Sequence, residues 1–500
     1  MSDQASTADG TQLRFGEPAG RWVLAATVLG STVAFLDATV VNIALPAIGS
    51  DLSADASGLT WTVNAYALAL AALVLVGGSL GDQFGRRRLF MLGVAWFGLA
   101  SLACALSTGI EMLVVSRALQ GIGAALLAPG ALAILQATFR PEDRSRAIGA
   151  WSGLAGTAGA VGPFLGGWLV EQGSWRWIFL INVPVVLMVL AITARHVPES
   201  RDDTVRGGHD LSGAVLGALA LGAVTYALSA WSERGVAALT LPLSVGLVAL
   251  IAFVVRERSA STPMLPLSIF AAPRFAATNA VTFLVYAGLG GVFFWLVLTL
   301  QVVAGWSPLS AGLSLLPVTV IMLLFSPQAG MLGDRFGPRL PLTLGPLLGA
   351  VGVALLARLG PDAAYFTDVL LPVSLLGAGL TITVTPLTST ALGAVEGDRA
   401  GLAGGINNAV ARTGGLVVVA SLPAVSGLAE GGFADPTALQ PAFHTAMLIC
   451  AALLASAGAV AAVAFAAPTA RRRPGRGVKG LIRHCAVDAT PLSVGERASR

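Results

Sequence analysis

Fourteen long apolar stretches follow one another along the chain, separated by short polar segments. A helix needs about 20 mostly apolar residues to cross a bilayer, and each stretch provides roughly that length. Only 11% of the residues are charged and 55% are hydrophobic, unlike a soluble globular protein. The sequence therefore predicts an all-α integral membrane protein. Its predicted transmembrane helices are 22–46, 59–80, 88–107, 112–137, 146–169, 176–195, 211–231, 238–255, 276–302, 309–332, 340–358, 366–390, 400–427 and 441–466.

One short motif occurs twice, at the end of an apolar stretch in each case. Residues 78–87 read GSLGDQFGRR and residues 330–339 read GMLGDRFGPR. Such a repeat implies two related halves. In a membrane chain, two related halves favour an alternating-access transporter over a channel or an anchored enzyme. The distance between the copies leaves room for six helices and for one further pair.

The spacing therefore predicts six helices, then an inserted pair, then six more. We expect a cytoplasmic tail at 1–21, a six-helix bundle at 22–195, a linker at 196–210, the inserted pair at 211–255, a linker at 256–275, a second six-helix bundle at 276–467 and a basic, disordered cytoplasmic tail at 468–500.

Basic residues predict the orientation. Most of the 30 lysines and arginines fall in the two tails and in alternate loops, so the positive-inside rule places both termini in the cytoplasm. A twelve-helix chain would alternate in the same way, so the inserted pair rests on hydropathy and spacing. Arginine far outnumbers lysine, which is typical of GC-rich bacterial genomes, and we expect the inner membrane of a bacterium.

Several classes of site have no support in the sequence. The three cysteines, Cys104, Cys450 and Cys485, are scattered, and so are the four histidines, which argues against disulfides and metal sites. No catalytic cluster lies within the predicted spans. The net charge of +4 reflects orientation and gives no case for nucleic-acid binding. We expect no enzyme activity, no metal, no cofactor and no nucleic-acid partner.

Asp37 is the acidic residue that lies deep inside a predicted span, 22–46. A carboxylate at mid-membrane costs about 2.5–3.5 kcal/mol on insertion scales, and burial favours its protonated form. Such a group can take up a proton in one conformation and release it in another. The plain alternative is a buried aspartate that only bonds neighbouring helices. Intramembrane acids are functional by default, so we favour the proton-carrying role.

Arg117 lies inside the predicted span 112–137 and cannot plausibly lose its proton. It therefore needs a partner within the protein or a wet cavity. An arginine close to Asp37 would favour the ionised carboxylate, so approach of the two would expel a proton and separation would restore it. The alternative is a static salt bridge. The sequence alone does not establish that the two residues touch.

Small residues line one face of the predicted span 146–169. Glycines recur there every three or four residues, which lets another helix approach closely, and Pro163 removes a backbone donor and permits a bend. This pattern suits a helix that rocks against a partner, although tight static packing would also explain it. The residues assigned to this motif are Gly159, Gly162, Pro163, Gly166 and Gly167.

The repeated motif predicts two tight cytoplasmic turns. Glycine permits the turn, an aspartate can cap a helix or pair with an arginine, and the arginines hold the loop inside. Contacts made and broken here would gate the inner face, although setting topology alone is the alternative. The assigned residues are Gly78, Gly81, Asp82, Gly85, Arg86 and Arg87 in the first copy, and Gly330, Gly333, Asp334 and Gly337 in the second. Pro338 replaces Arg86, so we expect the second copy to be the weaker latch.

Together these motifs resemble those of the major facilitator superfamily, in particular its fourteen-helix drug:proton antiporters (EmrB/QacA type). The similarity extends from the first predicted helix to the last. It is carried by the loop motif, by Arg117 with Gln120 and Gly121, by the glycines of 146–169, by LDATVVNIALP around Asp37, by Trp61 and Tyr66, by Trp175 to Phe179 with Asn182 and Pro184, and by GINNAVARTGG around Arg412. The resemblance implies proton influx coupled to export of lipophilic compounds, with Asp37 and Arg117 on the coupling pathway.

One departure bears on the cargo. Some family members that export dications carry additional acids in the second half, whereas 309–332 and 400–427 contain no acidic residue. A single deep acid suggests about one proton per cycle and favours neutral, monocationic or anionic cargo. The polar residues offered as cavity candidates are Asn42, Asn64, Tyr66, Gln120, Gln136, Asn279, Tyr286, Gln301 and Arg412.

The leading hypothesis is thus a proton-driven exporter of small amphipathic molecules, whose partners are the cargo, protons and the bilayer. One alternative is a proton-coupled importer or a narrow metabolite transporter. Another is a membrane scaffold or sensor that does not transport. The sequence does not reveal whether an accessory protein extends the export path.

Overall fold

The computed structural model describes residues 12–201, 210–260, 263, 265–395, 400–428 and 433–466. Within these ranges the chain is almost entirely helical, and the only β pairing is an isolated bridge between Leu13 and Phe139. Each of the fourteen predicted apolar stretches coincides with a helix or with two consecutive helices. The predicted membrane fold of two six-helix bundles and an inserted pair is confirmed.

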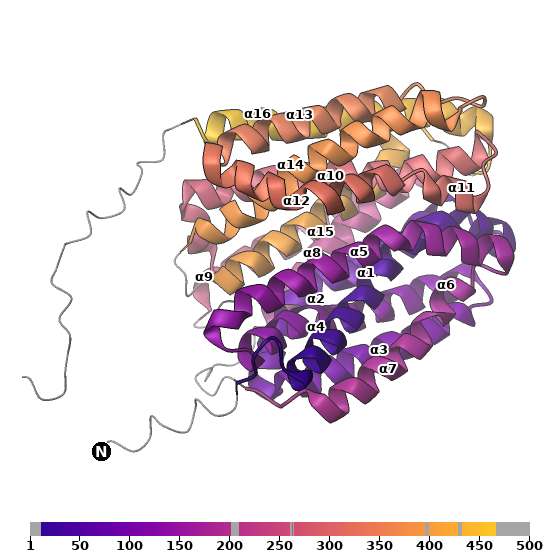
Figure 1. Ribbon diagram of the computed structural model, residues 1–500. Coiled ribbons are helices and arrows are strands. Elements are labelled where there is room, and N and C mark those ends of the chain that lie inside the picture. Colours follow the sequence, from indigo (N-terminus) through magenta and orange to yellow (C-terminus); the bar gives the residue numbers. More distant parts are fainter. Residues whose placement is uncertain are drawn as a thin grey trace, which may run out of the picture.

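The first bundle contains six spans, the last of which is interrupted (Figure 1). Its helices pack as α2 against α4, α3 against α4, α1 against α5 and α1 against α7. Most are longer than the apolar stretch predicts, because their polar ends extend beyond the hydrocarbon core. The elements are α1 (Pro18–Leu52), α2 (Ala56–Phe84), α3 (Arg86–Ala105), α4 (Ile110–Thr138), α5 (Pro141–Gln172), α6 (Trp177–Leu180) and α7 (Asn182–His196).

The second bundle repeats this pattern, with its second span interrupted after α11. Here α10 packs against α15 and α16, and α13 packs against α14 and α16. The largest buried apolar cluster draws on both bundles. The elements are α10 (Pro273–Val302), α11 (Pro308–Leu313), α12 (Leu316–Phe336), α13 (Arg339–Leu356), the π-helical η3 (Tyr365–Val369), α14 (Leu370–Gly393), α15 (Ala400–Val425) and α16 (Pro436–Ala464); the 3-10 turn η2 (Leu267–Ala271) precedes them.

The inserted pair consists of α8 (Leu211–Arg234) and α9 (Thr240–Ser259), joined by the 3-10 turn η1 (Val236–Leu239). Helix α8 contacts α2 of the first half and α15 of the second, whereas α9 packs chiefly on α8. An apolar outer surface is therefore left on α9, where Leu241 is 74% exposed. Lipid is the natural environment for such a surface.

A polar contact fixes the cytoplasmic end of this pair. The Asp210 carboxylate accepts hydrogen bonds from the backbone N–H of Gly213 at 2.8 Å and from Nε of Arg256 at 3.1 Å. Burial alone would raise the pKa of Asp210, but these donors, the Ser212 hydroxyl and the Arg256 charge outweigh burial and lower that pKa. The contact therefore ties the start of α8 to the end of α9.

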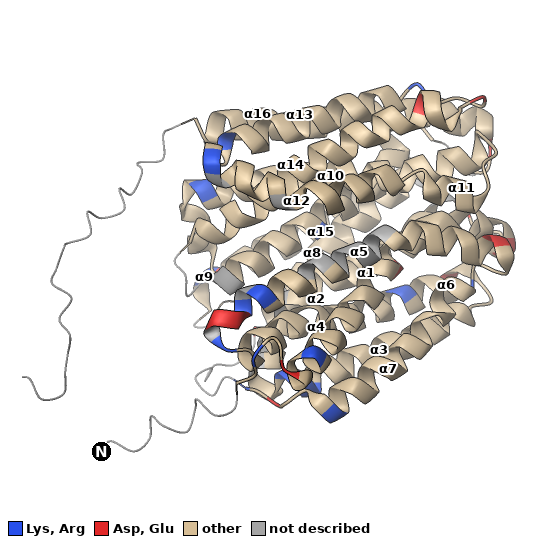
Figure 2. Cartoon of the chain, in the orientation of Figure 1, with Lys and Arg blue, Asp and Glu red and all other residues tan. Residues whose placement is uncertain are grey.

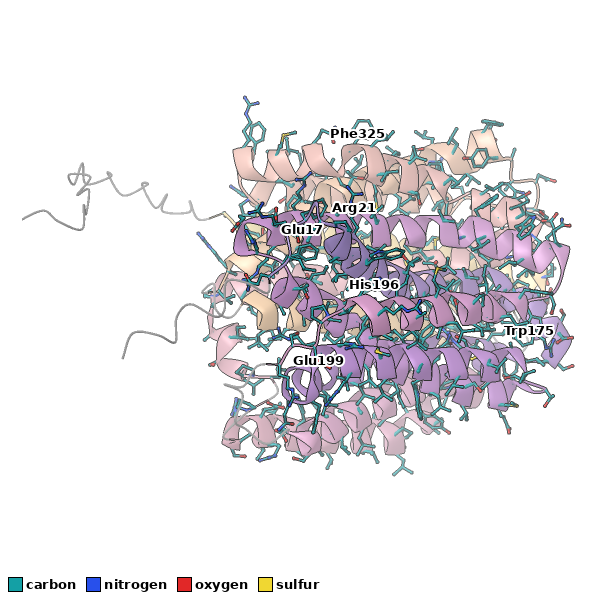
Figure 3. All side chains as sticks on the ribbon, turned by 60° about the horizontal axis from the view of Figure 1, so that its bottom comes forward. Glu17, Arg21, Trp175, His196, Glu199 and Phe325 are labelled. Carbon is teal, nitrogen blue, oxygen red and sulfur yellow. The ribbon has the colours of Figure 1, made fainter. Side chains whose placement is uncertain are left out.

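Thirteen spans in the described chain are long and apolar enough to cross a membrane by length and composition. Helix α5 is the long helix outside this set. The start of α1 and the end of α16 lie at the same end of the bundle (Figure 1). Basic residues gather mainly at that end (Figure 2). Glu17, Arg21 and Glu199 also lie there, and Trp175 lies at the opposite end (Figure 3).

Candidate functional site

A buried ion pair joins α1 to α4 at the level of the membrane interior. The guanidinium of Arg117 donates through one terminal nitrogen to Oδ2 of Asp37. Both side chains are 1% exposed. A buried charge is tolerated only when paired and hydrogen-bonded, so each residue accounts for the presence of the other. The structure thus brings together the two residues that the sequence singled out.

Three polar neighbours complete the surroundings of the carboxylate. Oδ1 of Asp37 accepts from Nε2 of Gln120 at 2.8 Å and from Nδ2 of Asn182 at 3.2 Å. The hydroxyl of Ser101 accepts from both amides, at 2.7 Å from Gln120 and 3.2 Å from Asn182. Arg117 also donates to the amide oxygen of Gln120. The result is a closed polar network built from α1, α3, α4 and α7.

Arg117 is held on its remaining sides by α2 and by an aromatic ring. Its Nε donates to the backbone oxygen of Thr62 at 3.0 Å. The guanidinium carbon lies 4.4 Å from the ring centroid of Tyr66 and 5.8 Å from that of Phe179. Stacking on an aromatic face stabilises a desolvated cation. Tyr66 is itself positioned by a hydrogen bond from its hydroxyl to the oxygen of Ala34, at 3.3 Å.

All three side-chain donors around Asp37 point to its oxygens. A proton on either oxygen would displace one of those donors. Because the four contributing helices are separate elements, a relative shift of α1 and α4 would rearrange these contacts.

A second polar group lies in the other half, around a cavity of about 200 Å³. Asn407 donates to Oδ1 of Asn279 at 3.2 Å and to the Thr282 hydroxyl at 2.7 Å, which joins α15 to α10. Of the predicted cavity residues, Tyr286 lines this space. The lining residues are Tyr286, Thr388, Ala391, Leu392, Gly404, Asn407, Asn408 and Ala411.

Other candidates from the sequence lie elsewhere. Asn64 of α2 is fully buried, and neither its amide nitrogen nor its oxygen has a partner within the described chain; the same holds for the amide oxygen of the half-buried Asn42. Gln136 is exposed near the end of α4, about five turns beyond Arg117. Gln136 therefore lies far from the buried network, because its apolar stretch ends at the membrane surface.

The last two candidates lie where the halves meet. Gln301 of α10 donates from Nε2 to the oxygen of Ile43 in α1 at 3.0 Å. Arg412 of α15 is half-buried, in a helix that packs against α2 of the first half and α10 of the second. Gln120, also offered as a cavity residue, is instead enclosed in the Asp37 network.

Glu199, to which the sequence assigned no role, contacts the first copy of the loop motif and holds its turn in place; we call this contact the Glu199 latch. Gly85 has a φ of 108°, and a Cβ there would lie 2.7 Å from Oε1 of Glu199. The same carboxylate accepts from the backbone N–H of Arg87 at 3.1 Å, and Nε of Arg88 lies 3.7 Å from it. The Glu199 carboxylate thus caps the N-terminus of α3 by accepting a hydrogen bond from its first turn. A side chain at position 85 would exclude it.

The structure describes the surroundings of only some of the remaining residues of the loop motif. The side chains of Asp82 and Asp334 lie outside the described set. Gly78 faces Pro129 and Gly81 faces Leu89 at ordinary contact distances. In the second copy, Gly337 has a φ of 74°. Gly330 and Gly333 face Thr385 and Pro386. The backbone N–H of Arg86 donates to the oxygen of Ser200 at 2.9 Å, which adds a second contact to the first latch.

Glycines of α5 allow close contact with α1. A Cβ on Gly162 would collide with the Thr39 hydroxyl, and one on Gly166 would lie 2.8 Å from Cγ1 of Val40. Gly159 is helical, but its surroundings lie outside the described set. The predicted smooth face therefore meets α1, close to the chain segment that carries Asp37.

The same helix forms a close contact between the halves. A Cβ on Gly167 would lie 2.6 Å from Cα of Leu309 in α11, and one on Gly312 would collide with the backbone oxygen of Pro163. The N–H of Leu309 also donates to Glu171 at 3.3 Å. These contacts lie near the end of α5, at the side of the bundle opposite the basic residues (Figure 2).

A family comparison identifies this architecture. Residues 27–420 match the family model described as Major Facilitator Superfamily. The chain belongs to this superfamily. It is 36% identical over 403 residues to the tetracenomycin C resistance and export protein of Streptomyces glaucescens, covering 80% of this chain and 74% of that protein. It is 38% identical over 416 residues to a cephamycin export protein of Amycolatopsis lactamdurans, covering 81% and 86%.

Solved structures agree at the level of the fold. A bacterial homologue of the human lysosomal transporter Spinster, in an inward-facing and occupied conformation, aligns with a TM-score of 0.63 and 16% identity, over 90% of this chain and 97% of that one. A transporter of the POT family aligns with a TM-score of 0.65 and 15% identity, over 89% of this chain and 98% of that one. This superfamily member is a multi-pass membrane transporter. Its described residues contain no group of three or more His, Cys, Asp or Glu side chains placed to hold a metal.

Proposed function

We propose that this superfamily member is a proton-driven antiporter that exports small lipophilic or amphipathic compounds across the inner membrane of a bacterium. The observation that carries the proposal is the buried Asp37–Arg117 pair. Its carboxylate is enclosed by hydrogen-bond donors from Arg117, Gln120 and Asn182. Relatives named as resistance and export proteins support the outward direction.

In the proposed cycle, Asp37 exchanges its proton as α1 and α4 move. With Arg117 bound, the carboxylate is ionised and the proton has left toward the cytoplasm. When α4 shifts against α1 and the guanidinium withdraws, the carboxylate remains in a low-dielectric interior that favours its protonated form. A proton from the outer side then neutralises it, and the return movement releases that proton inside.

The moving parts in this proposal are the two contact regions described above. The close approach of α5 to α11 closes the outer end, and the Glu199 latch holds the inner loop between α2 and α3. A cavity between bundles that opens alternately to each side would carry the cargo. The proposal includes both termini in the cytoplasm and the domain boundaries predicted from the sequence.

The test is proton-driven uptake of a fluorescent lipophilic dye into inside-out vesicles. Wild type should accumulate dye under an imposed pH gradient, and Asp37→Asn should not. Asp51→Asn is the matched control, because Asp51 lies on the same helix at its exposed outer end and pairs with Arg176. Asp37→Glu distinguishes a lost proton carrier from misfolding, since it keeps the carboxyl group. Full accumulation by Asp37→Asn would remove Asp37 from the proton pathway.

A further inference from the structure

Arg412 is a half-buried cation that has no counter-charge within the described chain. It lies in α15, which packs against α2 and α8 on one side and α10 and α14 on the other. Its side chain is half-buried, and it makes no ion pair or hydrogen bond with any described residue. An arginine at this depth remains charged, and a charge inside a membrane protein is ordinarily paired.

None of the carboxylates that the structure describes pairs with Arg412. Asp37 is committed to Arg117 and to two amides. The other acidic residues of the described chain lie at or near helix ends or in loops. Among the described residues, the central region therefore contains two guanidinium groups and one carboxylate, which leaves one positive charge to be neutralised.

The surroundings of Arg412 have the form of a binding site. Asn408 and Ala411, on the same stretch of α15, line the cavity of about 200 Å³, and so does Tyr286 of α10. Residues four apart on a helix share a face, so Asn408 and Arg412 lie one above the other. Helix α15 also packs against α2, so this stretch lies at the boundary between the halves. A cation, a phenol ring and amides suit an aromatic or amphipathic ligand with an anionic group.

We infer that Arg412 selects amphipathic organic monoanions, such as aryl carboxylates, as cargo, because the anionic group of the cargo supplies the counter-charge that Arg412 lacks among the described residues. This inference rests on the proposed export function and adds the class of cargo. Export of one anion in exchange for one entering proton moves two net positive charges inward, so the potential and the pH gradient both drive it. A neutral compound would move one charge and a monocation none.

The test compares two probes with one scaffold, anthracene carboxylate and anthracene carboxamide, in inside-out vesicles under a proton gradient. Wild type should transport the carboxylate faster than the amide, above the background of protein-free vesicles. In Arg412→Gln the ratio of carboxylate to amide rates should fall at least about 30-fold, the scale expected on removing one member of a buried charge pair. Arg412→Lys, which keeps the charge, should retain most of the ratio. Arg358→Gln, at an exposed site after α13, is the control.

Each outcome decides a different point. An unchanged ratio in Arg412→Gln, or wild-type transport of the amide but not the carboxylate, would overturn the inference and leave proton-driven export intact. Equal loss of both probes at normal protein levels would also overturn it, since Arg412 would then serve the conformational cycle. If wild type moves neither probe nor a cationic dye under a proton gradient, the proposed function itself fails.

Discussion

Removal of the Asn182 amide offers a graded test of the buried network. Asn182 donates one of the three side-chain hydrogen bonds to Asp37, at 3.2 Å, and its other partner, Ser101, still receives a bond from Gln120. Asn182→Leu keeps the branched shape of the side chain, with the same number of heavy atoms, and deletes that donor. A hydrogen bond to a charged group contributes about 1.5–3 kcal/mol, and the long distance favours the lower value.

A loss of about 1.5 kcal/mol from the ionised state alone corresponds to roughly one pH unit. Asn182→Leu should therefore move the pH midpoint of cargo-induced proton release upward by about one unit, because the carboxylate holds its proton more tightly. The assay follows proton release on cargo addition with a pH-sensitive dye, using purified protein in nanodiscs over a range of pH. Membrane insertion and thermal stability of the variant serve as folding controls.

The double variant Asp37→Asn with Asn182→Leu separates this effect from general disturbance. If Asn182 acts through Asp37, adding Asn182→Leu to Asp37→Asn should leave the rate of dye exchange without a gradient as it is in Asp37→Asn alone. A midpoint that stays in place in Asn182→Leu, or that moves downward, would refute the reasoning. It would show that Asn182 does not stabilise the ionised carboxylate or that Asp37 does not titrate in the cycle.

Three further outcomes follow from the packing. Gly85→Ala should slow transport at normal protein levels, because its Cβ would displace the Glu199 carboxylate and the φ of 108° disfavours alanine. Transport by this variant at the wild-type rate would contradict a role for the Glu199 contact in the cycle. Gly123→Ala should lower stability in detergent by about 1–3 kcal/mol, since its Cβ would lie 2.7 Å from the backbone nitrogen of Phe97. Thermal inactivation measures the loss of stability, and a curve equal to that of wild type would contradict the predicted clash. The pKa of Asp210 is lowered in the fold, so its stabilising effect is present above the unfolded value and is lost as pH falls through the folded value. Asp210→Asn should therefore make the free energy of unfolding less dependent on pH in the acidic range. An acid dependence equal to that of wild type would contradict the stabilising role of the Asp210 carboxylate.

The membrane fold was predictable because hydrocarbon thickness fixes the length of a span. Polar ends of helices carry no comparable signal, so α1 extends to Pro18 and Leu52 beyond its predicted stretch. The breaks at Ile181 and between α11 and α12 were not predicted either. Hydropathy is averaged over a span, and a short interruption within an apolar run leaves that average unchanged.

The two charged residues of the site were identifiable because the membrane makes their burial costly. Their contact was not, since sequence does not fix how helices rotate about their axes. Asn182 belonged to a motif noted in the sequence, yet it received no role because its neighbours across α3 and α1 were unknown. Glu199 was missed because it lies in a linker. Gln136 was offered as a cavity residue from its apolar surroundings, but it is exposed near the end of α4.

The central claim is that Asp37 carries the proton, and one pair of measurements on Asp37→Asn tests it most directly. In the same vesicles, dye-for-dye exchange without a gradient reports the conformational cycle, and accumulation under a pH gradient reports coupling. The account predicts that Asp37→Asn still exchanges dye but no longer accumulates it. Accumulation that persists at the wild-type level in the variant would contradict the assignment of the proton to Asp37.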